Sequence, residues 1–80
     1  QVSFYFYAGL GYNQLKEYKK AKNILENGLD FVVEFNPSES GIYNNRFNVN
    51  FYKQLIISCE NLNDKVKKEV YTNKLKQLQK

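Results

Sequence analysis

Small residues recur at helical spacing among large apolar ones in the first 28 residues, and this alternation constrains the fold more than any other feature. Gly9 and Gly11 lie in one apolar segment, and Ala21 and Gly28 lie in the next. Two antiparallel helices cross closely only where one of them offers little more than backbone, so these residues predict the crossing points of a helical hairpin. Glycine inside a helix costs about 1 kcal/mol relative to alanine, which favours close packing as the reason for its presence. The chain is expected to reverse direction near residues 16 and 17.

The same segment carries a spaced pattern of residue types. In chain order these are an aromatic, a small residue, Tyr, Leu, Tyr, Ala, a large apolar residue and a small residue. These places are taken by Tyr5, Gly9, Tyr12, Leu15, Tyr18, Ala21, Leu25 and Gly28. The order resembles the tetratricopeptide repeat, a family of helical hairpins. The resemblance implies an all-α fold in which hairpins stack as a right-handed α-solenoid, a scaffold for binding rather than catalysis. An ordinary helical hairpin with chance spacing is the alternative.

A displacement of 47 residues brings the chain onto a second, weaker copy of this pattern. Identical residues then meet in the pairs Val2 and Val49, Phe4 and Phe51, Tyr5 and Tyr52, Leu15 and Leu62, and Lys20 and Lys67. The copy departs from the pattern where Gly9 meets Ile56 and Ala21 meets Lys68, and the usual period of the family is 34 residues. The second hairpin is therefore expected to be a degenerate, terminal unit, with a break near residues 61–64.

One domain of four helices over residues 1–80 follows from these two copies. We expect hairpin one at about 2–35, a loop at 36–44 and hairpin two at about 45–79, with Asn36 and Pro37 ending the second helix and Asn63-Asp64 capping the fourth. Because repeat arrays usually need at least about three units, the chain is expected to be a fragment of a longer protein. The expected buried stripe of the fourth helix is Val66, Val70, Tyr71, Leu75 and Leu78.

The amino-acid composition argues against several kinds of catalytic and metal-binding site. The chain has no histidine, the commonest general base and metal ligand, and its single cysteine, Cys59, excludes both an intrachain disulfide and a cysteine-based zinc cluster. No Gly-rich phosphate loop is present. We therefore expect no enzyme activity, no cofactor and no metal. No apolar run approaches the roughly 20 residues that span a bilayer, so a cytoplasmic protein without membrane contact is expected.

The charged residues can belong either to a solvated surface or to a binding surface. The formal net charge is +4, and lysines surround the last helix instead of forming one ridge. A solvated helix is the favoured interpretation, and no direct sequence-specific binding to nucleic acid is expected of this segment. Glu26, Asp30 and Glu34 form an acidic row at i, i+4 spacing, for which a solvated face is favoured over a docking stripe.

A protein or short peptide in the inner groove is the expected partner. In the repeat family this groove is lined by the first helix of each hairpin. The resemblance and the 47-residue displacement carry the groove to Ser3, Phe6, Leu10, Asn13, Gln14, Asn50, Lys53, Ile57 and Asn61. Amides on this face would bond a peptide backbone, and the apolar residues would take its side chains. The alternative is that Phe6 and Leu10 pack on a further hairpin.

Two settings remain open at this stage. The long, lysine- and asparagine-rich repeats resemble the sensor domains of peptide-responsive transcription regulators of Gram-positive bacteria, which implies peptide sensing or dimerisation as a homo-oligomer. The competing interpretation is a general adaptor or chaperone domain of the same repeat family that binds a protein partner. A DNA-binding domain encoded upstream of Gln1 would distinguish the first setting from the second.

Overall fold

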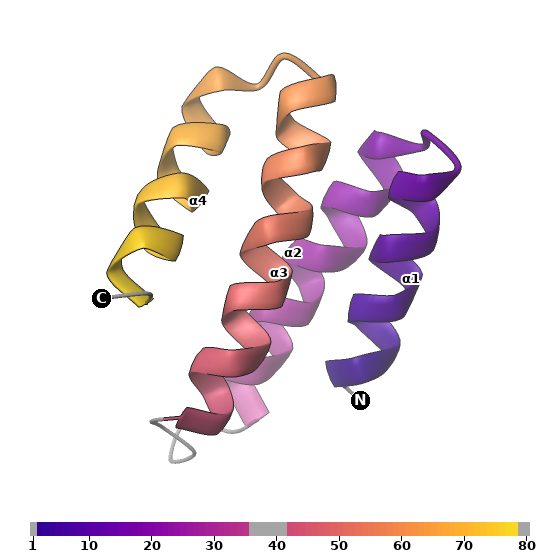
Figure 1. The fold of residues 1–80 in the computed structure, drawn as a ribbon. Helices are drawn as coiled ribbons and strands as arrows, with labels where there is room; N and C mark the ends of the chain where they lie inside the picture. Colours follow the sequence, from indigo (N-terminus) through magenta and orange to yellow (C-terminus); the bar gives the residue numbers. More distant parts are fainter. Residues whose placement is uncertain (1, 36–41, 79–80) are drawn as a thin grey trace.

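Four helices and no strand make up the part of the chain that the computed structural model describes, residues 2–35 and 42–78. The helices are α1 (Val2–Gln14), α2 (Tyr18–Phe35), α3 (Ile42–Asn61) and α4 (Lys65–Leu78). They lie roughly side by side, with α1 and α4 on the two flanks and both short turns at the same end (Figure 1). The prediction of an all-α fold with four helices is confirmed.

The helix boundaries follow the sequence signals closely, with one difference. Helix α2 continues to Phe35, as its uninterrupted apolar pattern predicts. Helix α3 begins at Ile42, which is earlier than the predicted start at about 45. Residues 42–44 are therefore helical rather than part of the loop. The expected helix stop at Asn36 and Pro37 lies outside the described residues.

The turn between α1 and α2 is built from backbone hydrogen bonds around a left-handed residue. Lys16 has a φ of 64°. Its amide donates to the Asn13 carbonyl at 3.0 Å, and the Glu17 amide donates to the Tyr12 carbonyl at 2.8 Å. This pair of bonds is the Schellman arrangement, which satisfies carbonyls that the end of a helix would otherwise leave free.

The turn between α3 and α4 repeats this arrangement 47 residues later. Asn63 has a φ of 58°, and its amide donates to the Glu60 carbonyl at 3.3 Å. The Asp64 amide donates to the Cys59 carbonyl at 2.9 Å. The Asp64 carboxylate then accepts from the Lys67 amide at 3.1 Å, which confirms it as the N-cap of α4. The displacement found in the sequence thus joins two turns with equivalent backbone bonding.

The hydrophobic core lies mainly between α2 and α3. Its buried residues are Ala21 and Leu25 of α2, Phe51, Leu55 and Cys59 of α3, and Tyr71 of α4. Helix α1 covers one side of this core with partly buried aromatic side chains. The molecule is only 17 Å across in its smallest dimension, less than two helix diameters. Every helix therefore keeps one side at the surface. Cys59 is fully buried and serves as a small core residue.

Of the four predicted crossing points, Gly9 and Gly28 are close contacts between helices, Ala21 is buried in the core, and Gly11 is not a contact. A Cβ at Gly9 would overlap the Leu25 side chain, and a Cβ at Gly28 would lie 2.6 Å from Phe51 and 2.7 Å from Tyr5. These glycines let α1, α2 and α3 approach each other. Nothing lies within 4 Å of a Cβ built at Gly11, so the prediction of close packing there is wrong. Gly11 faces outward from α1.

Several apolar residues predicted to pack are instead at the surface. Leu15, one of the positions of the repeat pattern, is 70% exposed, and Val66 of α4 is 75% exposed. Val70 is also exposed. Among the described residues the backbone of α4 comes close to that of α3 alone, so only the side of α4 that carries Tyr71 is buried. The buried stripe predicted for α4 is confirmed at Tyr71 and wrong at Val66 and Val70, while Leu75 and Leu78 are half-buried.

The contrast between the glycines yields a paired test of packing. We expect Gly28→Ala to lower the free energy of unfolding by about 1–3 kcal/mol, because the new methyl group must displace Phe51 or Tyr5. Gly11→Ala meets open space and should raise it by up to about 1 kcal/mol through helix propensity. Urea unfolding followed by circular dichroism measures both. Equal effects of the two substitutions would contradict the assigned packing.

Candidate functional site

The residues predicted to line the inner groove all lie on α1 and α3, which contact each other. Their side chains differ in accessibility. The exposed ones are Ser3, Gln14, Asn50, Lys53, Ile57 and Asn61. Phe6 and Leu10 are half-buried, and Asn13 is buried. Most of the residues predicted to line the groove are therefore accessible, but Asn13 is not, and Phe6 and Leu10 are only partly so.

Phe6 packs within the molecule. Its ring lies 5.9 Å from that of Phe51 in an edge-to-face arrangement, and it also meets the ring of Tyr7 at 5.4 Å. Such aromatic pairs add to the stability that burial provides. Phe6 therefore contributes to the contact between α1 and α3, and only its remaining exposed part is open to a partner.

Asn13 joins α1 to α3 through its side-chain amide. The amide nitrogen donates to the Gln54 carbonyl and to the Gln54 Oε1, both at 3.0 Å. The amide oxygen accepts from the Ser58 hydroxyl at 2.7 Å. Asn13 is 8% exposed, so its hydrogen bonds are made inside the protein. This corrects its expected role as a donor to a bound peptide backbone.

Asn61 also has an internal partner, although it is exposed. Its amide nitrogen donates to the Ile57 carbonyl at 2.9 Å, one turn back on α3. The surface that remains accessible on the two helices is called here the α1–α3 face and consists of Ser3, Leu10, Gln14, Asn50, Lys53 and Ile57. It combines a cation, amides and apolar groups.

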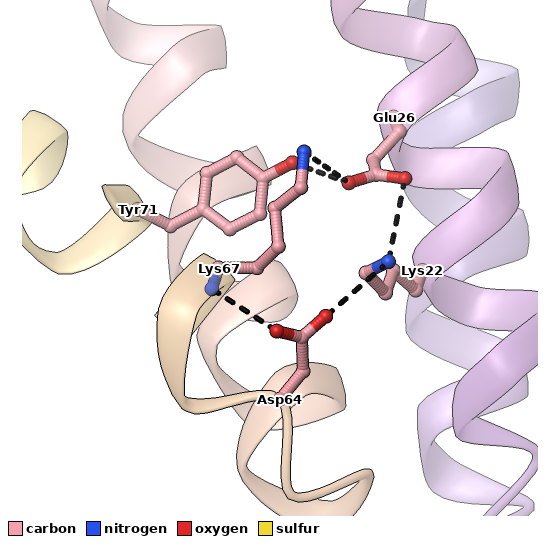
Figure 2. A network of polar contacts seen from close by, with 5 residues as sticks. All are labelled: Lys22, Glu26, Asp64, Lys67 and Tyr71. Atoms are coloured by element: carbon pink, nitrogen blue, oxygen red, sulfur yellow. Dashed lines mark hydrogen bonds and ion pairs between the residues drawn. The ribbon is translucent and has the colours of Figure 1, made fainter. Parts of the chain in front are cut away.

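A second group of polar residues links α2 to α4 and was not predicted as a site. The Tyr71 hydroxyl of α4 donates to the Glu26 carboxylate of α2 at 2.5 Å. Lys22 lies 3.8 Å from Glu26 and 3.6 Å from Asp64, and Lys67 lies 3.8 Å from Glu26. Figure 2 shows these five side chains meeting between the two helices. The expectation of a solvated face does not hold for Glu26, which faces α4.

An open cleft of about 450 Å³ lies beside this polar group. Its walls are formed by α2 and α4, and its floor by α3. The lining residues are Glu26, Leu29, Asp30, Asn48, Tyr52, Lys67, Val70, Tyr71 and Lys74. Carboxylates stand on the α2 side and lysines on the α4 side. The rings of Tyr52 and Tyr71 stack there at 5.8 Å.

Two buried groups in this part of the molecule, the Tyr71 phenol and the Cys59 thiol, hold their protons more tightly than usual. Burial, and then the hydrogen bond to Glu26, raise the pKa of the Tyr71 phenol well above its ordinary value, so the group keeps its proton at neutral pH. Burial likewise raises the pKa of the Cys59 thiol, which disfavours the reactive thiolate. Tyr71 acts as a hydrogen-bond donor that fixes α4 on α2.

Two kinds of feature, a metal-binding cluster and a membrane-spanning helix, are absent from the described residues. No group of three or more acidic, cysteine or histidine side chains is placed to hold a metal ion. None of the helices described combines the length and apolar character needed to cross a membrane. Comparison with protein-family models, with curated proteins and with solved structures finds no match to this chain.

The internal role of Asn13 is testable against its neighbour. Asn13→Ala should lower the free energy of unfolding by about 1–3 kcal/mol, because it leaves the buried Ser58 hydroxyl without its acceptor. Gln14→Ala, one residue on and exposed, should change it by less than about 0.5 kcal/mol. Chemical denaturation of both variants provides the comparison. If they are equally stable, the bonds of Asn13 do not hold α1 to α3.

The Tyr71 hydrogen bond should appear as a dependence of stability on pH. Because the folded chain holds the phenol proton more tightly than the unfolded chain, this contribution is complete below the ordinary pKa of 10.0 and is lost as pH rises above it. Tyr71→Phe should cost about 1 kcal/mol at neutral pH and progressively less in alkali. Denaturation curves at several pH values measure this. Parallel stability profiles for the two proteins would contradict the assignment.

Proposed function

We propose that this chain is a non-catalytic interaction module of the tetratricopeptide-repeat type, with two hairpins of a right-handed α-solenoid, and that its α1–α3 face binds an extended peptide or a segment of a partner protein. The repetition of one hairpin turn after 47 residues is the observation that carries the proposal. Two turns with the same backbone bonding, each with the equivalent position (Lys16 and Asn63) in the left-handed conformation, support an organisation in repeats.

The packing of the helices supports the same proposal. Helix α3 contacts both helices of the first hairpin as well as its own partner α4, while α1 and α4 remain on the flanks. Hairpins that stack in this way leave the first helices of successive units next to each other, and their accessible sides form one surface. Here those helices are α1 and α3.

The chemistry of the α1–α3 face suits an extended peptide. Gln14 and Asn50 offer amide donors and acceptors to a peptide backbone. Leu10 and Ile57 offer apolar contacts for side chains, and Lys53 offers a cation for an acidic group. Peptide-binding grooves combine a few polar groups that fix orientation with apolar positions that supply affinity.

Two biological settings fit this module. The first is the regulatory part of a cytoplasmic transcription regulator of Gram-positive type, which senses a short peptide or dimerises. The second is a general adaptor or chaperone domain with a protein partner. The buried, free thiol of Cys59 fits a reducing compartment in either case. A helix-turn-helix domain encoded upstream in the same reading frame would favour the regulator, and its absence would favour the adaptor.

Peptide selection tests the binding face directly. Random peptides displayed on phage are selected on the wild-type chain, and the enriched peptides are synthesised and titrated by fluorescence anisotropy. Lys53→Glu should weaken their binding by at least about tenfold, because it places a carboxylate on the α1–α3 face. Lys76→Glu makes the same charge change at an exposed position of α4 and should leave binding unchanged. Failure to enrich any peptide, or equal losses in both variants, would contradict the proposal.

A further inference from the structure

The cleft between α2 and α4 is bridged by side chains at one end. There the Glu26 carboxylate accepts from the Tyr71 hydroxyl and lies 3.8 Å from the Lys67 ammonium group (Figure 2). Asp30 lies one helical turn further along α2, and Lys74 lies two turns beyond Lys67 on α4. Because α2 and α4 both run away from the two short turns (Figure 1), Asp30 and Lys74 line the cleft beyond this bridge.

Asp30 and Lys74 are the two charges of the cleft that the fold leaves without a counter-charge. Both side chains are exposed, and neither takes part in an ion pair or a side-chain hydrogen bond within the described part of the chain. Glu26 and Lys67, by contrast, lie close to each other. The free carboxylate and the free ammonium group belong to opposite walls, so the cleft offers a ligand one charge of each sign.

Apolar and aromatic side chains also line this cleft. The rings of Tyr52 and Tyr71 stack at 5.8 Å, with Leu29 on the α2 side and Val70 on the α4 side. Tyr52 and Leu29 are half-buried, and Val70 is 40% exposed. These groups offer apolar contacts to the body of a ligand, in addition to the charges that would fix its ends.

The balance of charge in the cleft indicates the kind of ligand. Two carboxylates line one wall and two ammonium groups line the other. A ligand with a single charge would be attracted by one wall and repelled by the other, whereas a zwitterion is attracted by both. Because the charges stand on opposite walls, they suit a zwitterion whose own charges are held apart by a chain. The volume of about 450 Å³ lies within the range of roughly 300–1,000 Å³ that is typical of small-molecule sites.

We propose that the cleft between α2 and α4 binds a small zwitterion of the ω-amino carboxylate type, in which an apolar chain separates an ammonium group from a carboxylate. The ammonium group of the ligand pairs with Asp30 and its carboxylate pairs with Lys74. The chain between them lies against Tyr52 and Val70. This site shares no residue with the α1–α3 face, so it is independent of peptide binding there.

Titration with 6-aminohexanoate tests the site. The backbone amide signals of the isotope-labelled chain are followed by nuclear magnetic resonance. Signals of the residues that line the cleft should shift and saturate, with a dissociation constant in the millimolar range that suits a ligand of this size. Hexanoate lacks the ammonium group and hexylamine lacks the carboxylate. Each of them should bind at least about fivefold more weakly than 6-aminohexanoate, because one ion pair is missing.

Matched charge reversals locate the two ends of the ligand. Lys74→Glu should weaken the binding of 6-aminohexanoate at least about fivefold, whereas Lys76→Glu makes the same change at an exposed position of α4 outside the cleft and should have no effect. Asp30→Lys should weaken binding to a similar extent, with Glu69→Lys as its control. The double variant Asp30→Lys/Lys74→Glu should regain most of the affinity, because the zwitterion can bind in the opposite direction.

Several outcomes would overturn the proposal. One is the absence of saturable shifts at the cleft. Another is binding of hexanoate or hexylamine as tight as that of 6-aminohexanoate, which would mean that only one wall takes part. Equal losses in Lys74→Glu and Lys76→Glu, or a double variant that binds no better than either single variant, would also contradict it. Circular dichroism checks that the variants are folded, and none of these outcomes affects the peptide-selection result.

Discussion

The insertion of Phe51 against Gly28 is the contact on which the rest of the structure depends. It brings α3 close to both helices of the first hairpin, because a side chain at Gly28 would occupy the space of Phe51 and of Tyr5. Burial of Leu25 and Leu55 around this point follows from the close approach. Without it the chain would consist of two separate hairpins, each too small to bury a core of its own.

The polar contacts determine how the hairpins are oriented around this joint. Asn13 connects α1 to Gln54 and Ser58 of α3, on one side of the core. Glu26 connects α2 to Tyr71 of α4, on another side. A purely apolar contact between helices tolerates sliding, whereas a buried hydrogen bond with a fixed partner does not. The two links therefore restrict the register in which the four helices pack.

Sequence periodicity predicted the positions of the helices and turns well. It predicted less well which residues of different helices contact each other. The burial of Ala21 and Leu25 and the position of the second turn followed from spacing and from the 47-residue displacement. The roles of Gly11 and Asn13 did not, because a helical position indicates a direction around the axis but not which element lies there. Asn13 lies at the boundary between the side of α1 that contacts α3 and the exposed side. A small difference in direction around the helix axis therefore determines whether its side chain is buried against α3 or exposed.

The same limit explains why the link between Glu26 and Tyr71 was missed. Glu26 and Tyr71 are 45 positions apart, and no local sequence pattern relates them. Only the packing of α4 on α3 brings the two side chains together. The α1–α3 face was easier to place because both of its helices belong to the repeated part of the pattern. Its membership still depended on details of burial that no spacing encodes.

Helix α4 has one consequence for the dynamics of the molecule. Tyr71 is its only buried residue among those described, so α4 contributes fewer buried side chains to the core than α2 or α3 does. Cooperative units of low stability open first in native proteins. The C-terminal helix is thus the expected site of sub-global unfolding. Cys59, which has charged groups of the second turn and α4 around it, would report such an event through its rate of thiol labelling.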